Sequence, residues 1–338
     1  MSSLRVAAAV AVAVGLLHVE AHAASVKKID LKAGYKEGAI VSRPVLDGSA
    51  VGPIEVLAFR EAYDKKENVI RRKKSRLTGG GLERTIDKQL DLGIVFADAL
   101  RAEAPKMGFT VGSGGWKIGG EIREIYLDNA TPSAWSMGVL LFYTSMTVKF
   151  ELVSPSGERA EHSQRLLGYF VTSGNVANNS LARQMVMGAQ DALARLNAST
   201  FKAPPHAGVA AMLGEFQPRR VGDAKDLSRM IGLSGSRDAV APLLEKLSQE
   251  RDAGDRTFLV TALASVGGPD ALNALAGRYA DEDPDNRLAT LKVYEYVGSA
   301  DARQRAGEAF DKEPDEYLKK LAREVADGVA VRGALPKK

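Results

Sequence analysis

The stretch VGGPDALNALAGRYADEDPDNRLATL, residues 266–291, decides how the C-terminal half of the chain folds. A glycine pair and a proline open a segment with apolar residues at helical spacing, and an acidic loop separates it from a second such segment. Arg256 and Arg287 are 31 residues apart, and each is followed by Val-Gly ten residues later and then by Asp-Ala. A fixed period of this length, with two helical segments per period, is typical of an α-solenoid.

The same unit recurs on both sides of this stretch. Asp238-Ala239 stands about one period before Asp270-Ala271, and PDEYLKKLAREVAD, residues 314–327, has the pattern of one more first helix. The arginine that opens the first helix and the Gly-x-x-Asp-Ala turn resemble the HEAT-like repeats of the phycobilisome-lyase type, over about residues 224–330. The resemblance implies a partner-binding scaffold. The first unit departs from the pattern, because it lacks the arginine and has an extra residue in its turn.

The recurring aspartates and arginines could be read as a catalytic array or as structural groups. A catalytic carboxylate would occur once, whereas these residues return in each unit. We therefore expect the aspartates to cap the second helices and the arginines to bond to loop carbonyls or carboxylates of a neighbour. The residues concerned are Asp238, Asp270, Asp301, Arg256 and Arg287.

The N-terminal half has a different periodicity. GPIEVLAF predicts a strand, and residues 82–108 predict a helix that Pro105 and Gly108 end. Three segments then alternate as strands, with a bulge at Arg123-Glu124, and SLARQMVMGAQDALARLNAS predicts an amphipathic closing helix. We expect an α+β domain with the order strand, helix, antiparallel strands, helix, in which two helices cover one sheet, followed by an all-α HEAT-like solenoid.

Parts of this half resemble a known group of envelope proteins. ALRAEAPKMGFTV, GGEIREIYLDNA, MTVKFELVSPSGE and the closing helix resemble YajG-like periplasmic (lipo)protein domains, over about residues 50–200. The resemblance implies a non-enzymatic helper of envelope transport or assembly. The lipid-bearing cysteine of that family has no counterpart in this sequence.

The N-terminus predicts export. Arg5 precedes a short apolar core, residues 6–17, and an Ala-His-Ala site follows at residues 21–23. We expect a signal peptide over residues 1–23 and a periplasmic or secreted protein. The expected parts are then the α+β domain at 25–202, a linker at 203–223, the solenoid at 224–330 and a basic tail at 331–338.

The composition is poor in catalytic groups. The chain has no cysteine, which excludes disulfides and thiolate sites, and only His162 and His206 lie beyond the expected signal. Their neighbours suggest a surface position for His162 and no evident partner for His206. RLTGGGLERT fits neither the phosphate-loop nor the dinucleotide pattern, and no Gly-x-Ser-x-Gly elbow occurs. We expect no enzyme activity, no cofactor and no metal, although a carboxylate pair from distant positions would escape a reading of the sequence.

Charge is divided between the halves. Residues 24–223 hold 27 Lys or Arg and 21 Asp or Glu, whereas residues 224–330 hold 15 and 20. The densest basic run could bind anionic lipid or an acidic polymer, or it could be a solvated loop. It consists of Arg71, Arg72, Lys73, Lys74 and Arg76. TPSAWSMGVLLFYTS could likewise be an apolar contact loop or, as we favour, the start of a core strand.

Two functions remain after these exclusions. The first is a non-enzymatic cell-envelope adaptor that binds a protein partner through the second helices of the solenoid, and the second is a lipid- or polymer-binding protein that acts through the N-terminal domain. Nucleic acid is not expected as a partner of an exported protein. For the adaptor, the expected contact positions are Asn273, Arg278, Gln304 and Glu308.

Overall fold

The computed structural model describes residues 27–35, 40–63, 69–71, 83–85, 87, 89–129, 140–172, 177–216, 226–250, 253–266, 269–281 and 284–328. The expected signal peptide, the basic positions 72–76 and the basic tail lie outside these ranges, as do residues 130–139.

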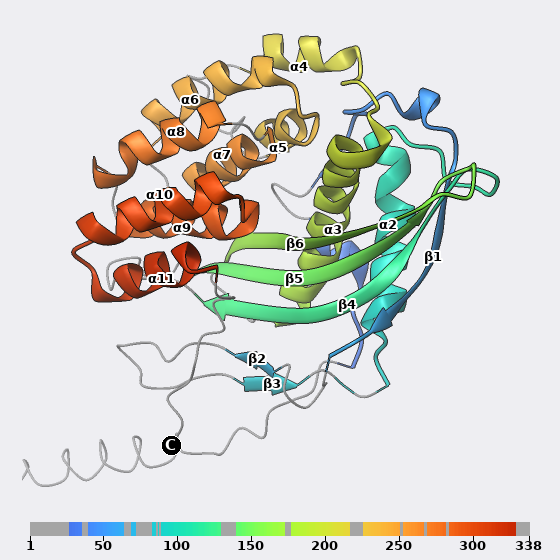
Figure 1. Ribbon diagram of the computed structural model, residues 1–338, viewed down its shortest axis with the longest axis horizontal. Helices are drawn as coiled ribbons and strands as arrows, with labels where there is room; N and C mark the ends of the chain where they lie inside the picture. The colour runs from blue at the N-terminus through green and yellow to red at the C-terminus, as the bar shows by residue number, and fades with distance from the viewer. Residues whose placement is uncertain are drawn as a thin grey trace, which may run out of the picture.

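A mixed four-stranded sheet forms the N-terminal half (Figure 1). Its strands lie in the order β1, β4, β5, β6, and β1 runs parallel to β4 whereas the other pairs are antiparallel. The bounds are β1 Ile54–Glu61, β4 Trp116–Asn129, β5 Leu140–Val153 and β6 Arg159–Thr172. A short ribbon, β2 Val69–Arg71 with β3 Glu83–Thr85, pairs separately.

Two helices, α2 (Leu92–Met107) and α3 (Ala177–Leu196), pack on one face of this sheet. Ile118, Ile122 and the even-numbered residues 146–152 of β5 are buried under them, as the alternating pattern predicts. The register of β4 against β5 shifts between Ile122 and Glu124, which confirms the predicted bulge. The strand–helix–strands–helix order and the helix-covered sheet are therefore confirmed.

The first helix begins later than the sequence pattern indicates. The pattern predicts a helix from residue 82, but Glu83–Thr85 is a strand and α2 begins at Leu92. Asp91 explains the start, because its side chain accepts a hydrogen bond from the backbone N–H of Ile94 at 3.1 Å and caps the helix. At the other end the helix includes Pro105, and Gly108, with φ of 109°, terminates it.

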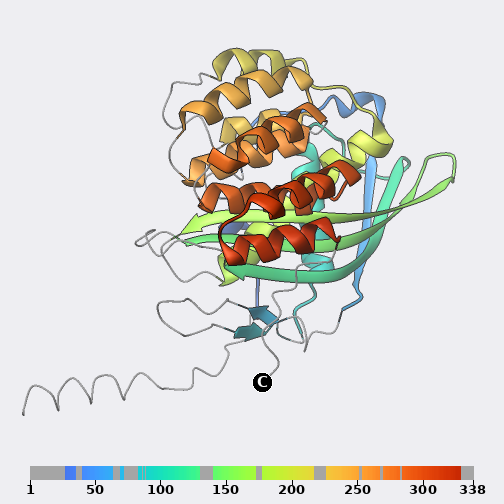
Figure 2. The ribbon, with the colours of Figure 1, turned by 60° about the vertical axis from the view of Figure 1, so that its left-hand side comes forward.

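The C-terminal half is a series of helices in consecutive pairs (Figure 2). The pairs are α5 Asp226–Leu233 with α6 Val240–Gln249, α7 Ala253–Val266 with α8 Pro269–Arg278, and α9 Pro284–Val297 with α10 Ala300–Lys312; α11 Glu316–Ala326 closes the series. In the part of the chain that the structure describes, no helix has the length and apolar character needed to cross a membrane.

The segment expected to be a linker is structured where it is described. A π-helix, Asn197–Phe201, ends just before it, and the segment itself contains α4, Gly208–Glu215. Its backbone also pairs with an early segment, since the N–H of Asp47 bonds to the carbonyl of Pro204 at 2.8 Å and the N–H of His206 to that of Val45 at 3.0 Å. This stretch is thus attached to the sheet half.

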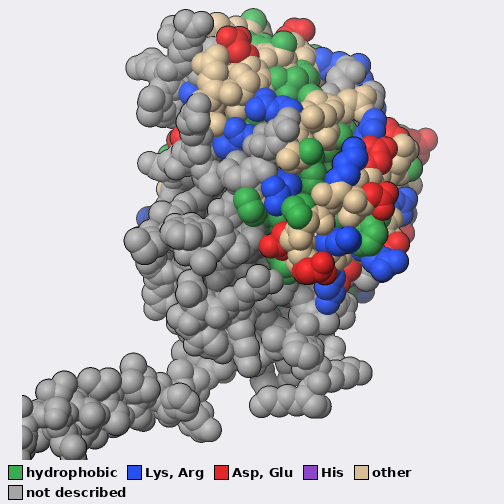
Figure 3. All heavy atoms as spheres, turned by 90° about the vertical axis from the view of Figure 1, so that its left-hand side faces the viewer, with side chains coloured by type: hydrophobic (Ala, Val, Ile, Leu, Met, Phe, Trp, Pro, Cys, Tyr) green, Lys and Arg blue, Asp and Glu red, His purple; other side chains and the backbone are tan. Residues whose placement is uncertain are grey.

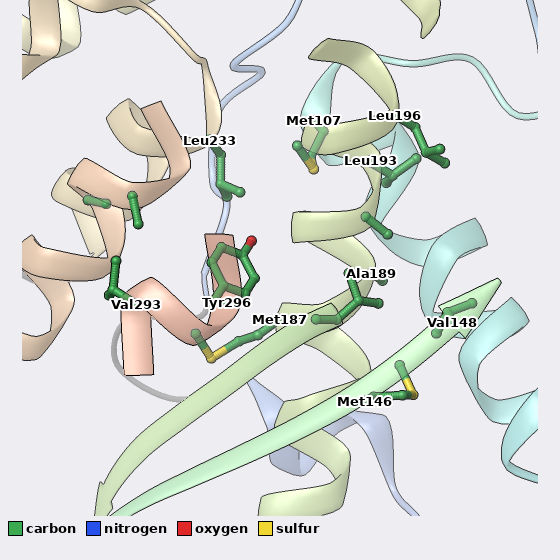
Figure 4. Close-up of a cluster of buried hydrophobic side chains, with 14 of the residues drawn as sticks. Met107, Met146, Val148, Met187, Ala189, Leu193, Leu196, Leu233, Val293 and Tyr296 are labelled. Carbon is green, nitrogen blue, oxygen red and sulfur yellow. The ribbon is translucent and has the colours of Figure 1, made fainter. Parts of the chain in front are cut away.

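Buried apolar residues form one continuous core through both halves. Figure 4 shows Met187 of α3 extending toward the helical half, where Leu233, Val293 and Tyr296 lie. As a result α3 is buried all round, with every residue from 181 to 193 in the interior. The predicted amphipathic helix is therefore covered by the sheet on one side and by helices on the other.

Candidate functional site

The first helix of each pair contacts the sheet half. Arg229 of α5 bonds to α3, Phe258 of α7 lies 5.9 Å from the guanidinium of Arg183, and the carbonyl of Tyr296 in α9 accepts from Arg195 at 2.8 Å. The second helices α6, α8 and α10 pack on the first helices and on one another, on the side away from α3 (Figure 1). The helical half therefore has an inner layer attached to α3 and an outer layer.

Three of the four expected contact positions come together on this outer layer. Asn273 lies on α8, and Gln304 and Glu308 lie on α10. The amide of Gln304 donates to Oε1 of Glu308 at 3.0 Å, and Arg305 bonds to both Glu308 and Asn273. We call Asn273, Gln304, Arg305 and Glu308 the α8–α10 surface. Arg278 stands at the last residue of α8 and is half-buried.

Arg305 is the residue that the sequence analysis missed. Its Nη1 approaches the two carboxylate oxygens of Glu308 at 3.2 and 2.9 Å, and its Nη2 reaches Asn273, 32 residues earlier. The arginine and glutamate are three residues apart on one helix, a spacing that indicates a pair. No local pattern indicates the bond to Asn273, because the pairing of α8 with α10 creates it.

The electrostatics of this surface suit an exchangeable contact. Hydrogen bonds from Arg305 and Gln304 lower the pKa of the Glu308 carboxyl. The side chains of Arg305 and Glu308 remain 30% and 43% exposed, so their pairing adds little to stability. Beneath them the hydroxyl of Tyr294 is buried without a hydrogen-bond partner, and burial raises its pKa. A bound group could therefore replace one surface partner of Arg305 at small cost.

The recurring arginines have the expected structural role. Arg256 donates from Nη1 to the carbonyls of Leu247 and Glu250 at 3.1 and 2.7 Å, at the end of α6. Arg287 bonds through Nε to the buried carboxylate of Glu313 at 2.9 Å. The Arg256 contact joins α7 to the preceding helix pair, as we expected, whereas Arg287 of α9 bonds to Glu313 at the end of α10, the other helix of its own pair.

The capping role expected for the aspartates is wrong at two positions. Ser299 caps α10, since its hydroxyl accepts from the N–H of Ala302 at 3.1 Å, and Asp301 lies inside the helix. Asp238 lies in a 3₁₀ turn before α6, which has no side-chain cap. A serine one residue before the helix fits the capping geometry better than an aspartate in its first turn. The side chain of Asp270 is outside the described set.

The two histidines are engaged in local hydrogen bonds. Nε2 of the half-buried His162 lies 3.1 Å from Oγ1 of Thr200, and Nδ1 of His206 accepts from the N–H of Gly208 at 3.0 Å. The expectation that His206 has no partner is therefore wrong. Among the described residues, no group of three or more His, Cys, Asp or Glu could hold a metal ion.

The basic run is described only at its first member. Arg71 ends β2, which pairs antiparallel with β3. Arg72, Lys73, Lys74 and Arg76 lie outside the described residues.

A second polar group, buried between the halves, was not anticipated from the sequence. Arg229 of α5 donates to Oδ1 of Asp191 at 3.1 Å, to Oε1 of Gln190 at 2.9 Å and to the carbonyl of Met187 at 3.1 Å. Gln190 then donates to Oε2 of Glu103 at 2.7 Å. Arg229, Asp191, Gln190 and Glu103 are each 2% exposed or less, and we call them the interface cluster.

The cluster holds charges in an unfavourable setting. Burial raises the pKa of Asp191, although Arg229 and Arg195 oppose the shift, and its Oδ2 has no hydrogen-bond partner. Glu103 is better satisfied, because Lys106 donates to it at 2.8 Å and the hydroxyl of Tyr35 also bonds to it. In the sequence, the cluster is indicated only by the pair Gln190-Asp191 between apolar residues of the closing helix. A polar pair on a helix normally indicates an exposed face, and here it is buried because other helices cover it.

Comparisons with known proteins give little further information. No family model matches the chain, and no curated protein is similar to it. Five solved chains are similar. One is the crystal structure of protein XCC0632 from Xanthomonas campestris, described with the family model DUF330, at 11% identity and a TM-score of 0.28. The match covers 47% of this chain and 92% of that one, and at this TM-score it supports no conclusion.

Proposed function

We propose that this protein is an exported, non-enzymatic adaptor of the bacterial cell envelope that binds a protein partner through the outer layer of its helical half. Its N-terminal half would be a YajG-like domain and its helices HEAT-like repeats, as the sequence resemblances imply. The observation that carries the proposal is the division into two layers. The inner helices are occupied by α3 and the sheet, whereas α8 and α10 present polar side chains outward.

The character of the outer layer supports a protein partner. On the side of the helical half shown in Figure 3, positive, negative and hydrophobic side chains are interspersed. A mixed surface of this kind favours specific pairing over general attraction to one sign of charge. Arg305 would be the central contact, because arginine is enriched where protein interfaces concentrate their binding energy.

The test is site-specific photo-crosslinking in native cell envelopes with the full chain. A photoreactive residue replaces Asn273 or Gln304, and the control carries it at Glu161, whose exposed side chain lies on the sheet half. We expect one discrete partner at the two helix positions and none at the control. The same products at all three positions would mean nonspecific collision and would contradict the adaptor.

A charge exchange sharpens this test. In Arg305→Glu/Glu308→Arg the ion pair within α10 can re-form, but the positive and negative charges have exchanged positions. We expect an unchanged far-UV circular dichroism spectrum and a loss of the crosslinked partner at Asn273. Retention of the partner would show that its binding does not depend on the positions of these two charges.

The runner-up function is binding of anionic lipid or polymer through the sheet half. The basic run of this half begins at Arg71, the last residue of β2, and precedes β3 in the sequence. Flotation of the full chain with anionic vesicles at low and high salt separates the two proposals, since surface electrostatics is screened by salt. Salt-sensitive flotation that is lost when the five basic residues become Gln would favour the runner-up.

A further inference from the structure

The contact between the two halves combines two kinds of interaction. One is apolar, with Met187 of α3 reaching toward Leu233, Val293 and Tyr296 (Figure 4). Apolar contacts are non-directional, and methionine adapts easily to a changed neighbour. This part of the contact holds the helices against α3 but would tolerate several positions of one half relative to the other.

The other part is directional. The guanidinium of Arg229 is only 2% exposed and donates to Asp191, to Gln190 and to the carbonyl of Met187, three acceptors that all lie on α3. All three bonds form together in one position of α5 against α3. A slide by one helical turn, about 5.4 Å, would bury Arg229 and Asp191 without each other.

A second directional contact fixes α9. Arg195, near the end of α3, donates to the carbonyls of Tyr296 at 2.8 Å and Arg165 at 3.1 Å, and its guanidinium lies 3.8 Å from the centre of the Tyr296 ring. Arg165 of β6 in turn pairs with Glu295 of α9 at 2.8 Å. Because α7 packs between α5 and α9, the two anchors hold the inner layer at both of its sides.

We propose that the interface cluster is an orientation latch: apolar contacts supply the attraction between the halves, and the buried charges select one relative orientation. A buried pair contributes little net attraction, because both ions lose their hydration, but a wrong orientation leaves an unpaired buried charge at a far greater cost. The inference is independent of what the α8–α10 surface binds.

The test measures distances between two spin labels, one in each half, by pulsed electron–electron double resonance. The chain has no cysteine, so two introduced cysteines are the only labelling sites. One label replaces the exposed Lys117 on β4, and the other replaces Ser248 on α6 or Lys320 on α11 in separate proteins. Two further proteins with both labels in the same half report whether each half keeps its own fold.

The latch variant is Arg229→Met/Asp191→Leu, which replaces the pair with apolar side chains. We expect it to stay folded, with unchanged distances within each half and a broadened or two-peaked distribution between the halves. The control is Arg287→Met/Glu313→Leu, which removes a comparable buried pair inside the helical half and should leave the distances between the halves narrow.

A narrow distribution with the wild-type mean in the folded latch variant would overturn the proposal, since apolar packing alone would then fix the orientation. If the double variant fails to fold, the same distances are measured in the single variant Arg229→Lys. Lysine keeps the charge but cannot reproduce the three bonds of the guanidinium fork. We expect partial broadening in this variant, and an unchanged distribution would equally refute the latch.

Discussion

At the scale of single residues, Arg229 and Asp191 are not equivalent partners. Arginine cannot shed its proton, whereas a buried carboxyl without its counter-ion can take one up. The raised pKa of Asp191 means that its charged form is less favourable in the fold than in water. Removing the negative and the positive member should therefore have different consequences.

We predict that Arg229→Met destabilises the protein by about 1–3 kcal/mol, because Asp191 loses its counter-ion but can take up a proton. Asp191→Asn should destabilise it by about 3 kcal/mol or more, because Arg229 keeps its charge and a neutral amide does not replace its buried counter-ion. Urea unfolding of both variants measures the difference. Equal losses would contradict the asymmetry.

The same carboxyl predicts a pH dependence. Its folded-state pKa lies above the ordinary value of 3.8, so its stabilising contribution is complete below that value and is lost as the pH rises through the folded-state pKa. We therefore expect Asp191→Asn to gain stability relative to the wild type as the pH rises above about 4. Unfolding curves of the two proteins across this range test it. A constant difference would show that Asp191 does not titrate in this window.

Single residues were predicted only where a periodic pattern identified them. The Arg256 and Arg287 contacts, and the grouping of Asn273 with Gln304 and Glu308, followed from a repeat in the sequence. The interface cluster did not, because its members are up to 126 positions apart and no local spacing relates Glu103 to Arg229. Such pairs exist only once α5 has packed on α3.

At the scale of helices and strands, Ser299 and Asp301 provide a direct comparison at the start of α10. Ser299→Ala should cost about 1 kcal/mol, because the N–H of Ala302 loses its side-chain acceptor. Asp301→Ala removes a favourable interaction with the helix dipole and an attraction to the charge of Arg305, and should cost about 0.5 kcal/mol or less. Thermal unfolding separates the two. A larger loss for Asp301→Ala would restore the capping role first expected of that residue.

Gly93 shows how closely α2 approaches the sheet. A β-carbon at this position would lie 2.1 Å from the carbonyl oxygen of Phe59 in β1, so the helix or the strand would have to move. We expect Gly93→Ala to destabilise the protein by about 1–3 kcal/mol. The control is Gly277 in α8, where an added β-carbon meets nothing within 4 Å. Gly277→Ala should stabilise by up to about 1 kcal/mol through helix propensity.

Elements were predicted better by type than by boundary. The strands β4, β5 and β6 and the helix pairs followed from alternation and from the 31-residue period. The start of α2 was misplaced because Ile86 and Leu90 continue its apolar spacing upstream, whereas the cap at Asp91 ends it. A local hydrogen bond thus overrode the periodic signal.

At the scale of the whole molecule, the sequence pattern suggested two domains joined by a linker, and the structure shows a core that continues from sheet to helices. Opening the molecule at α3 would expose Met187, Leu233 and Tyr296 together with the interface cluster. Because this exposure costs free energy, neither half is expected to stay folded without the other. The composition shift between the halves is real, but it describes their surfaces and carries no information about the interior.

Cooperative unfolding of the whole chain follows from this shared core, and the tryptophans provide a clean way to observe it. Both tryptophans, Trp116 and Trp135, precede residue 224, so intrinsic tryptophan fluorescence reports on the sheet half, where Trp116 packs on Phe201 at 5.4 Å. Far-UV circular dichroism is dominated by helices, and most of the described helices, α5–α11, belong to the other half, although α2 and α3 of the sheet half also contribute. We expect the two signals to change at the same urea concentration, as one transition.

Arg229→Met makes this test stricter. The arginine is remote from both tryptophans in sequence and belongs to α5, so its loss would lower only the circular dichroism midpoint if the halves unfolded separately. A shared core requires both midpoints to fall together. Ser299→Ala in α10 is the milder control, and it too should move the fluorescence midpoint although it lies far from α3 in the helix series. A fluorescence midpoint that stays fixed in both variants would mean two independent domains, and the helical half would then be a separable arm instead of part of one folding unit.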